Sequence, residues 1–377
     1  MTTVIWIDWY SYHLSRFRAL AEHDRLRGRV AGIELVGGCG VHSGLKFRDG
    51  DRLGLDIRSL APMSDWSEVG QWQLARLLWR ELTRLGPKTV FVPGYYTLPA
   101  LAAAVWARLH GARSVLMSET TAFDSRRAGW RESLKRLLAR ALFDYGIVGG
   151  KPHSRYLAHL GFHKDRIARF YDVVDNAYYK RATDEARRSP APYVHLNLPA
   201  SYFLFVGRLS PEKNLTGLLR EFAQYRSEGG QWSLVLVGDG PQRADLQEYA
   251  ETLGVASFVR FEGLKSTQDT IPYYAFSGCF LLPSTREPWG LVVNEAMASS
   301  LPVIASTQCG CAEDLVNPGT TGFTFSPFQP GALAQRMLAM STMPCEERLA
   351  MGRAAWEQVS AYSPQQWAEE VARIVEA

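Results

Sequence analysis

Two acidic residues in the segment REPWGLVVNE, positions 286–295, have the type and spacing of a ligand-binding pair. Pro288 and Gly290 keep Glu287 out of any helix, so its carboxylate can project from a loop. Glu295 follows after seven intervening residues, about one turn inside the helix expected to begin behind the loop. Carboxylates accept hydrogen bonds from hydroxyl groups, so the pair could hold a sugar and a ribose.

The start of that helix offers a site for an anion. Backbone N–H groups around Leu291 and Val292 have no partner inside the helix, and their partial positive charge favours a diphosphate beside them. We therefore expect Gly290, Leu291 and Val292 to contact a diphosphate, between the two hydroxyl-binding carboxylates. This combination predicts an enzyme that binds a nucleotide sugar.

A basic pair farther upstream fits the same ligand. Arg208 and Lys213 follow Gly207 near the start of a helix, where the helix dipole disfavours cations. A guanidinium group and an ammonium group can stabilise a departing diphosphate without a metal ion. The turn GDGP, positions 238–241, lacks the third glycine of a dinucleotide fingerprint and is more typical of a tight turn between a strand and a helix. Its first residue, Gly238, is included among the expected donor-binding residues.

Short apolar strands alternate with helices, which predicts an α/β fold with doubly wound parallel sheets. In the second half, strands are expected at 202–206, 233–237, 258–261, 279–282, 302–305 and 322–325. In the first half, they are expected at 4–7, 33–36, 90–92, 114–117 and 147–148. Ligands bind beyond the carboxyl ends of such strands, so Arg208, Glu287 and the loop 308–313 should lie on one rim.

A chain of 377 residues is too long for one ordinary core and predicts two domains. We expect an N-terminal acceptor domain at 1–188 and a C-terminal donor domain at 201–360. The segment 189–200 is rich in proline and lacks an apolar period, so it is the expected linker. The last helix, within 361–377, is expected to pack back toward the first domain.

Composition narrows the class of protein. A composition of 46% hydrophobic and 21% charged residues is typical of a globular protein. No apolar run in the sequence reaches the ~20 residues that a membrane span requires. The start of the chain reads as a buried strand and not as a secretory signal, which favours a cytoplasmic location. Charge is uneven: residues 1–190 carry 30 Lys or Arg against 19 Asp or Glu, whereas the remainder carries 12 against 19. A nucleic-acid binder would be basic throughout, so that class is excluded.

The basic segment 126–140 has two interpretations. Trp130, Leu134, Leu137 and Leu138 form an apolar stripe, as in a helix that lies on a membrane surface. The alternative, which we favour, is a helix packed on the sheet with a charged outer face, because a doubly wound fold needs such helices. Peripheral contact of the basic first half with the inner face of a membrane, or a phosphorylated lipid acceptor, remains a hypothesis.

Four motifs together resemble a retaining glycosyltransferase of family 4 (group 1). They are FVGRLSPEKN at 205–214, VGDGP at 237–241, the segment 286–295 and NPGTTGF at 317–323. The resemblance implies the GT-B fold, in which two Rossmann-like doubly wound domains face each other across a cleft. It also implies that Arg208, Lys213 and Glu287 are the catalytic residues: the first two bind the donor diphosphate and the third binds the transferred sugar. Glu295 would bind the ribose.

The resemblance further implies a reaction. A hexose would move with retention of configuration from a UDP-, GDP- or ADP-sugar to a hydroxyl of a glycan, glycolipid or lipid-linked sugar. No cofactor and no metal ion would be needed, and polysaccharide or glycolipid biosynthesis would be the setting. The alternatives are a non-catalytic nucleotide-sugar-binding protein, and an epimerase or hydrolase with the same fold.

The acceptor side departs from the family pattern. The usual glycine-rich loop after the first strand is replaced by DWYSYHLSR at 8–16. Where relatives place a histidine near the reacting centre, Glu119 or Asp124 could fill that role. His13 could orient or deprotonate an acceptor, since its ordinary pKa is near neutrality, or could cap and pack the first helix. The Asp-x-Asp pattern at 49–51 matches a manganese motif of another fold, but its flanking residues favour a hairpin turn.

Overall fold

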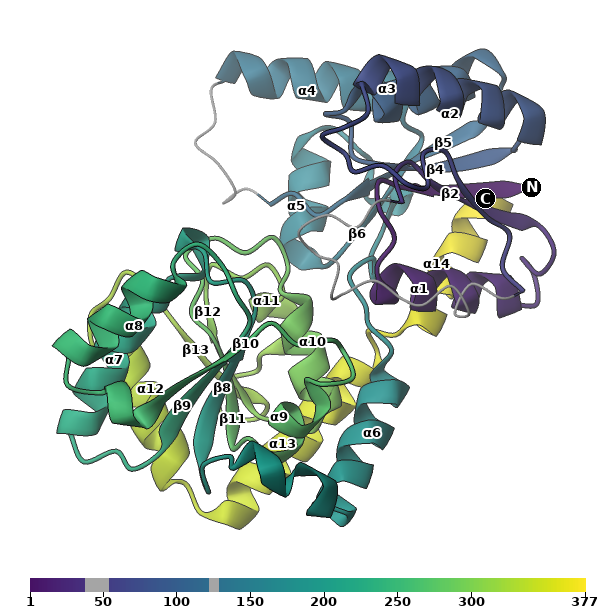
Figure 1. The fold of residues 1–377 in the computed structure, drawn as a ribbon. Helices are drawn as coiled ribbons and strands as arrows, with labels where there is room; N and C mark the ends of the chain where they lie inside the picture. The colour runs from purple at the N-terminus through teal and green to yellow at the C-terminus, as the bar shows by residue number, and fades with distance from the viewer. Residues whose placement is uncertain (38–53, 122–128) are drawn as a thin grey trace. The chain divides into compact units, whose positions relative to one another are not determined.

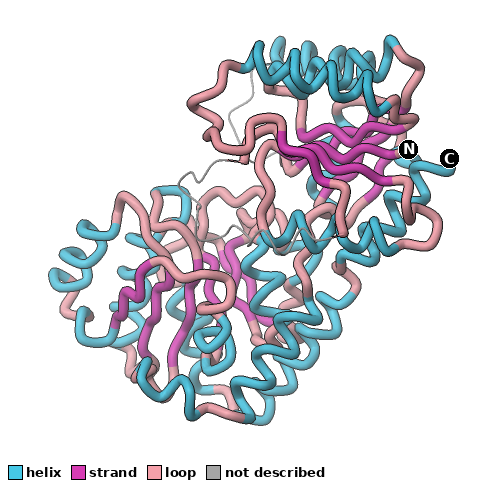
Figure 2. Tube along the Cα trace, turned by 45° about the vertical axis from the view of Figure 1, so that its right-hand side comes forward, coloured by secondary structure: helices cyan, strands magenta, loops and turns pink. Residues whose placement is uncertain are grey.

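The computed structural model describes residues 1–37, 54–121 and 129–377, which form two compact units. The first unit comprises Met1–Val174 and Ser363–Ala377, and the second comprises Asp175–Tyr362. Each unit is a parallel sheet with helices on both faces (Figures 1 and 2). The expected α/β class with two doubly wound domains is confirmed.

The first sheet has seven strands in the order β3-β2-β1-β4-β5-β6-β7. In chain order these are β1 Thr2–Trp6, β2 Val30–Glu34, β3 Ile57–Ser59, β4 Thr89–Pro93, β5 Arg113–Ser118, β6 Tyr145–Val148 and β7 Ile167–Ala168. Thr2 is aligned with Val30 on one side and with Thr89 on the other. Every residue of β1 and β2 is buried, as expected for parallel strands covered on both faces.

Helices cover both faces of this sheet. They are α1 Ser11–Glu22, α2 Gln71–Leu85, α3 Leu98–Leu109, α4 Gly129–Leu142, α5 Lys151–His159 and α14 Pro364–Glu376. The α2 and α3 helices pack together on one face, while α1 and α14 pack together on the other (Figure 1). Ser363 begins α14 by accepting a hydrogen bond from the Gln366 N–H at 3.2 Å. The last helix of the chain thus completes the first unit.

The second sheet has six strands in the order β10-β9-β8-β11-β12-β13. They are β8 Tyr202–Val206, β9 Ser233–Val237, β10 Val259–Gly263, β11 Cys279–Leu282, β12 Val303–Ser306 and β13 Gly322–Phe325. The helices are α6 Asn176–Arg188, α7 Leu215–Ser227, α8 Arg243–Thr252, α9 Ile271–Phe276, α10 Leu291–Ala298, α11 Ala312–Leu315, α12 Ala332–Thr342 and α13 Cys345–Ser360. The α7, α8 and α12 helices pack together, and α10 packs against α6 and α13 (Figure 1).

The boundary between the units differs from the expected linker. The chain passes into the second unit after Val174, and residues 189–200 lie within that unit. Arg187 at the end of α6 donates hydrogen bonds to the carbonyls of Ala275 at 2.8 Å and Ser299 at 2.7 Å. Arg260 likewise binds the Leu196 carbonyl at 3.1 Å. The sequence of the segment resembles a linker because arginine side chains, and not an apolar stripe, fix the segment and the end of α6 before it.

The helix α4 packs on the core, as the favoured interpretation of the basic segment expects, but two leucines of the apolar stripe face outward. Leu134 and Leu137 of α4 are 49% and 66% exposed, whereas Ala139 is fully buried. The helix packs on the core through Ala139 and the half-buried Leu142, while Leu134 and Leu137 face outward. None of the helices within the described ranges combines the length and apolar character needed to cross a bilayer.

Candidate functional site

The second unit brings Lys213 and Glu287 together where its strand order reverses. Strands β8 and β11 are neighbours, but the chain runs outward from β8 through β9 on one side and from β11 through β12 on the other. A crevice forms outside the carboxyl ends of the strands at such a point. The loop after β8 carries Arg208 and Lys213, and the loop after β11 carries Glu287.

Lys213 and Glu287 form an ion pair between the lysine Nζ and the carboxylate Oε2. The side chains are only 18% and 11% exposed, and the Ser284 hydroxyl donates a hydrogen bond to the same oxygen at 3.2 Å. The two loops are also joined through their backbones, since the Thr285 N–H donates to the Glu212 carbonyl at 2.9 Å. The carboxylate is therefore held in a fixed position beside the ammonium group.

The backbone of Glu287 is fixed from the other side as well. Its N–H donates to the Gln308 carbonyl at 3.3 Å, and its carbonyl accepts from the Gly310 N–H at 3.0 Å. The loop after β12 thereby supports the loop after β11. Three consecutive carboxyl-end loops of the sheet thus meet, as the parallel topology predicted.

Arg208 is exposed on the same rim. Within the described ranges, its guanidinium group has neither an ion pair nor a hydrogen bond. The turn that carries it is fixed, because the Gly207 N–H donates to the Val237 carbonyl at 2.9 Å. An exposed guanidinium group on a fixed turn can bind an anion without first losing a carboxylate partner.

Gly238 has a structural reason to be glycine. Its φ is +134°, and a Cβ at this position would lie 1.9 Å from the Gly207 carbonyl oxygen. The turns after β8 and β9 therefore approach each other backbone to backbone. Contact of Gly207 and Gly238 with a donor stays a prediction.

The helix α10 begins as the sequence predicted. Gly290 has a φ of +101°, and a Cβ there would lie 2.7 Å from Leu282 Cδ2. Among the described residues, no acceptor binds the backbone N–H groups of Leu291 and Val292. Trp289 is buried and donates from Nε1 to Asn294 at 2.8 Å, which fixes the entry to the helix. Two free N–H groups at a helix start form a site for an anion.

Glu295 lies inside α10, where two tyrosines contact it. The Tyr274 hydroxyl donates to Glu295 Oε2 at 2.7 Å, and Tyr179 forms a second hydrogen bond to the carboxylate. Burial raises the pKa of Glu295 to about 7, although the tyrosine hydrogen bonds lower it. Sequence reasoning missed both tyrosines, because α6, α9 and α10 come together only in the folded unit.

The first unit places Glu119 beside a second carboxyl group. Glu119 is exposed just after β5, whereas Asp172 is only 1% exposed. Burial raises the pKa of Asp172 well above its usual value, and the charge of Glu119 raises it further. Arg16, fully buried with Nη2 3.7 Å from Asp172, opposes this effect. Sequence reasoning missed Arg16 and Asp172, which 155 intervening residues separate.

His13 has the contacts of the capping and packing alternative. Its Nδ1 accepts a hydrogen bond from the Tyr10 N–H at 3.3 Å, and its ring stacks on Trp6 with the centroids 4.7 Å apart. Burial lowers the pKa of His13 well below its usual value, and Arg16 lowers it further. A buried neutral imidazole with a lowered pKa is a weak base, so a role in acceptor deprotonation gains no support.

Two further predictions cannot be placed. Asp124 and the Asp-x-Asp pattern at 49–51 lie outside the described residues. Within the described ranges, no group of three or more His, Cys, Asp or Glu side chains could hold a metal ion.

The second unit is similar to proteins of a known family. Residues 195–358 match the family described as glycosyl transferases group 1. The matched residues make up most of the second unit. The whole chain shares its fold with Anabaena HepE in complex with UDP, at a TM-score of 0.75 and 18% identity over 100% of both chains. The GT-B class expected from the sequence motifs is confirmed.

Curated relatives match over shorter stretches. The alpha-monoglucosyldiacylglycerol synthase of Streptococcus pneumoniae is 39% identical over 27% of this chain and 23% of its own length. The D-inositol 3-phosphate glycosyltransferase of Corynebacterium efficiens is 30% identical over 61% of this chain and 56% of its own length. The chain therefore spans less than two thirds of the length of these relatives.

Proposed function

We propose that the chain is a glycosyltransferase that binds a nucleotide diphosphate sugar at the carboxyl rim of the second unit. The observation that carries this proposal is the fixed Lys213–Glu287 pair at the strand-order reversal. A cation for a diphosphate and a carboxylate for sugar hydroxyls lie side by side there. The exposed Arg208 and the open N–H groups at the start of α10 add further anion-binding groups on the same unit.

The proposed donor is a UDP-hexose. Structures of Anabaena HepE contain UDP, UDP with glucose, and UDP-glucose, and HepE has the same fold over its whole length. In this proposal Glu295 binds the ribose hydroxyls, and Glu287 binds hydroxyls of the transferred sugar. GDP- and ADP-sugars are the alternatives that the first experiment tests.

The proposed chemistry is transfer with retention and without a metal ion. The bond between the anomeric carbon and the diphosphate oxygen breaks, and a bond to the acceptor oxygen forms on the same face. The acceptor proton passes to an oxygen of the departing diphosphate. Arg208 and Lys213 stabilise the negative charge that builds up on that diphosphate.

The proposed acceptor is a hydroxyl of a glycan, glycolipid or lipid-linked sugar. The similar proteins include an alpha-monoglucosyldiacylglycerol synthase and a D-inositol 3-phosphate glycosyltransferase. On the first unit, Glu119 is the exposed carboxylate at a strand end and is the proposed contact for the acceptor hydroxyl. Asp172, which is held beside Arg16, would help to position Glu119.

Peripheral contact with a membrane belongs to the same proposal. The exposed Leu134 and Leu137 on α4 support it, because an apolar pair on a basic helix can enter the head-group region of an anionic bilayer. Co-sedimentation with anionic vesicles should be salt-sensitive and should fall in a Leu134→Ser/Leu137→Ser variant. Equal sedimentation of the variant and the wild-type chain would refute the contact.

The experiment that tests the function is a thermal-shift panel of UDP-, GDP- and ADP-sugars in the presence of EDTA. A ligand that binds the native state raises its melting temperature. We expect a shift with UDP-glucose, followed by sugar transfer when an acceptor is added. Binding without any transfer would favour a non-catalytic binder, and free or isomerised sugar made without an acceptor would favour a hydrolase or epimerase. No shift with any donor would contradict the proposed site.

A further inference from the structure

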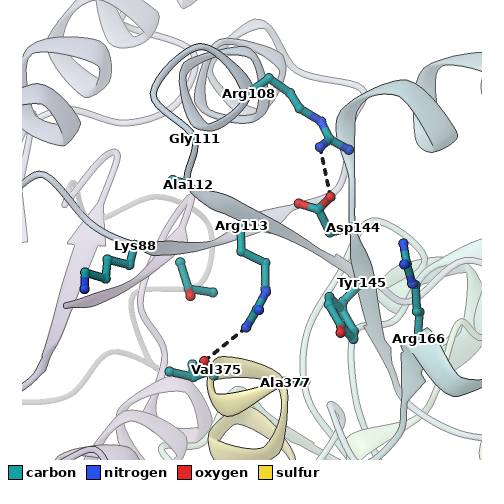
Figure 3. A pocket seen from close by; sticks show the side chains of 11 residues that line it. Lys88, Arg108, Gly111, Ala112, Arg113, Asp144, Tyr145, Arg166, Val375 and Ala377 are labelled. Atoms are coloured by element: carbon teal, nitrogen blue, oxygen red, sulfur yellow. Dashed lines mark hydrogen bonds and ion pairs between the residues drawn. The ribbon is translucent and has the colours of Figure 1, made fainter.

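A pocket of about 610 Å³ lies where the strands of the first sheet begin (Figure 3). Lys88 precedes β4, Arg113 and Tyr145 begin β5 and β6, and Arg166 precedes β7. Glu119 follows the carboxyl end of β5, so in this parallel sheet it lies at the opposite end of the strands. The pocket is therefore separate from the proposed acceptor side, and its volume is in the ordinary range of small-molecule sites, about 300–1,000 Å³.

The charge of this pocket is unbalanced. Asp144 is the one acidic side chain that lines it, against the cations of Lys88, Arg108, Arg113 and Arg166. Asp144 Oδ1 pairs with Arg108 at 2.9 Å, and its other oxygen accepts a hydrogen bond from the backbone of β5 at 2.9 Å. Among the described residues, no carboxylate pairs with any of the other three cations. With the terminal carboxylate of Ala377 counted as a second anion, the pocket holds four cations against two anions.

Two of the arginines have an ordinary structural explanation. Cationic side chains stabilise the C-terminal ends of helices. Arg108 lies in the last turn of α3, and Arg113 donates to the Val375 carbonyl in the last turn of α14 at 3.0 Å (Figure 3). This explanation does not account for Lys88 and Arg166, whose side chains have neither a carboxylate nor a hydrogen-bond acceptor within the described ranges.

An aromatic ring lies between two of the cations. The Arg113 guanidinium carbon is 5.4 Å from the Tyr145 ring centroid, and that of Arg166 is 5.9 Å from it. Figure 3 shows the Tyr145 ring between the two arginine side chains. Arg113 is fixed by its hydrogen bond to the backbone, so part of the pocket is already organised before an anion arrives.

We propose that this pocket binds a phosphate group, carried by a small phosphorylated molecule or by a phospholipid head group. Guanidinium groups match the geometry of phosphate oxygens, and a lysine adds a point charge. Lys88, Arg113 and Arg166 together balance the two or three negative charges of a phosphate monoester or pyrophosphate. The site accounts for part of the positive charge of the first half of the chain.

Calorimetric titration of the full chain with inorganic pyrophosphate at low salt tests the site. A Lys88→Gln/Arg166→Gln variant should bind at least about tenfold more weakly than the wild-type chain, since each lost charged hydrogen bond is equivalent to about a factor of ten. Arg353→Gln, which removes an exposed arginine from the second unit, is the matched control and should bind like the wild-type chain. Equal affinity of the double variant and the control would overturn the proposal.

Pyrophosphate is also expected to bind the donor rim, so Lys213→Met is titrated separately. This variant should keep the binding event that the Lys88→Gln/Arg166→Gln variant loses. If Lys213→Met removes all binding, the pocket takes no phosphate and the proposal is wrong. Neither Lys88 nor Arg166 has a side-chain hydrogen bond in the described structure, so the Lys88→Gln/Arg166→Gln variant is expected to keep the wild-type melting temperature, which checks that it folds.

Vesicles of phosphatidylcholine, with and without phosphatidic acid, distinguish the two sources of phosphate. A head-group site predicts phosphatidic-acid-dependent sedimentation that Lys88→Gln/Arg166→Gln loses and the control Arg353→Gln keeps. A site for a small phosphorylated molecule predicts pyrophosphate binding that depends on Lys88 and Arg166, with no such effect on vesicles. If neither pyrophosphate binding nor vesicle sedimentation depends on Lys88 and Arg166, both forms of the proposal are wrong.

Discussion

Lys213 and Glu287 stabilise each other in the second unit, so replacing either one has two separable consequences. Lys213→Met leaves a mostly buried carboxylate without its cation, which should lower the free energy of unfolding by about 2 kcal/mol. The same change removes a cation from the departing diphosphate, which should lower kcat/KM by about 100-fold. Urea unfolding and initial-rate kinetics measure the two effects.

The double variant Lys213→Met/Glu287→Gln separates stability from catalysis. It has no unpaired charge, so it should recover most of the stability lost in the single variant. Its activity should nevertheless stay at least about 100-fold below wild type, because the groups for the diphosphate and the sugar are both gone. Recovery of activity together with stability would show that the pair is only structural.

Glu295 should make the stability of the chain depend on pH. Its folded-state pKa of about 7 is above the ordinary value of 4.5, so the native state binds more protons than the unfolded state between these two pH values. Stability should therefore fall as pH rises from about 4.5 to 7, by on the order of 3 kcal/mol, and then level off. Urea unfolding at several pH values should show this fall, and Glu295→Gln should lack that part of it. An identical slope in both proteins would contradict the assignment.

The turn after β9 requires glycine because its backbone closely approaches the turn after β8, whereas an ordinary exposed turn requires glycine only for its backbone conformation. Gly238→Ala would place a Cβ 1.9 Å from a backbone oxygen, which cannot move without displacing β8. We expect a loss of about 3 kcal/mol or more. Gly254→Ala is the control: its φ is +68°, but nothing lies within 4 Å of the added Cβ, so about 1 kcal/mol should be lost. Similar losses in both variants would contradict the close approach.

The elements themselves were largely predictable, since buried parallel strands leave continuous apolar runs such as 202–206. The Gly290 turn and the start of α10 were also predictable, because a left-handed turn and a helix start depend on residues that are neighbours in the sequence. Contacts between residues that are distant in the sequence and that only tertiary packing brings together were not predictable. Tyr179 and Tyr274 reach Glu295 from different helices, and no spacing in the sequence announces this contact. The fixed segment 189–200 was mistaken for a linker because hydrogen bonds to its carbonyls come from the distant Arg260.

At the scale of the whole molecule, each unit should lose stability separately. Trp367 on α14 is fully buried, with its ring centroid 5.9 Å from that of Trp6. Trp367→Ala should destabilise the first unit by about 4 kcal/mol. Hydrogen exchange should then accelerate in β1 and α1 but not in β8 and β11. Trp72→Ala, which removes a side chain that is 79% exposed, should change exchange in neither unit. Uniform acceleration in both units would contradict this independence.

The return of α14 to the first unit also has a consequence for synthesis on the ribosome. The residues Met1–Val174 emerge first, yet Trp367 and the other α14 side chains that cover α1 emerge only after the entire second unit has been translated. Domains generally fold as they emerge, from the N-terminus onward. In this chain the second unit can close while the first still exposes the apolar surface of α1. The unit that is made first is therefore the last to be finished.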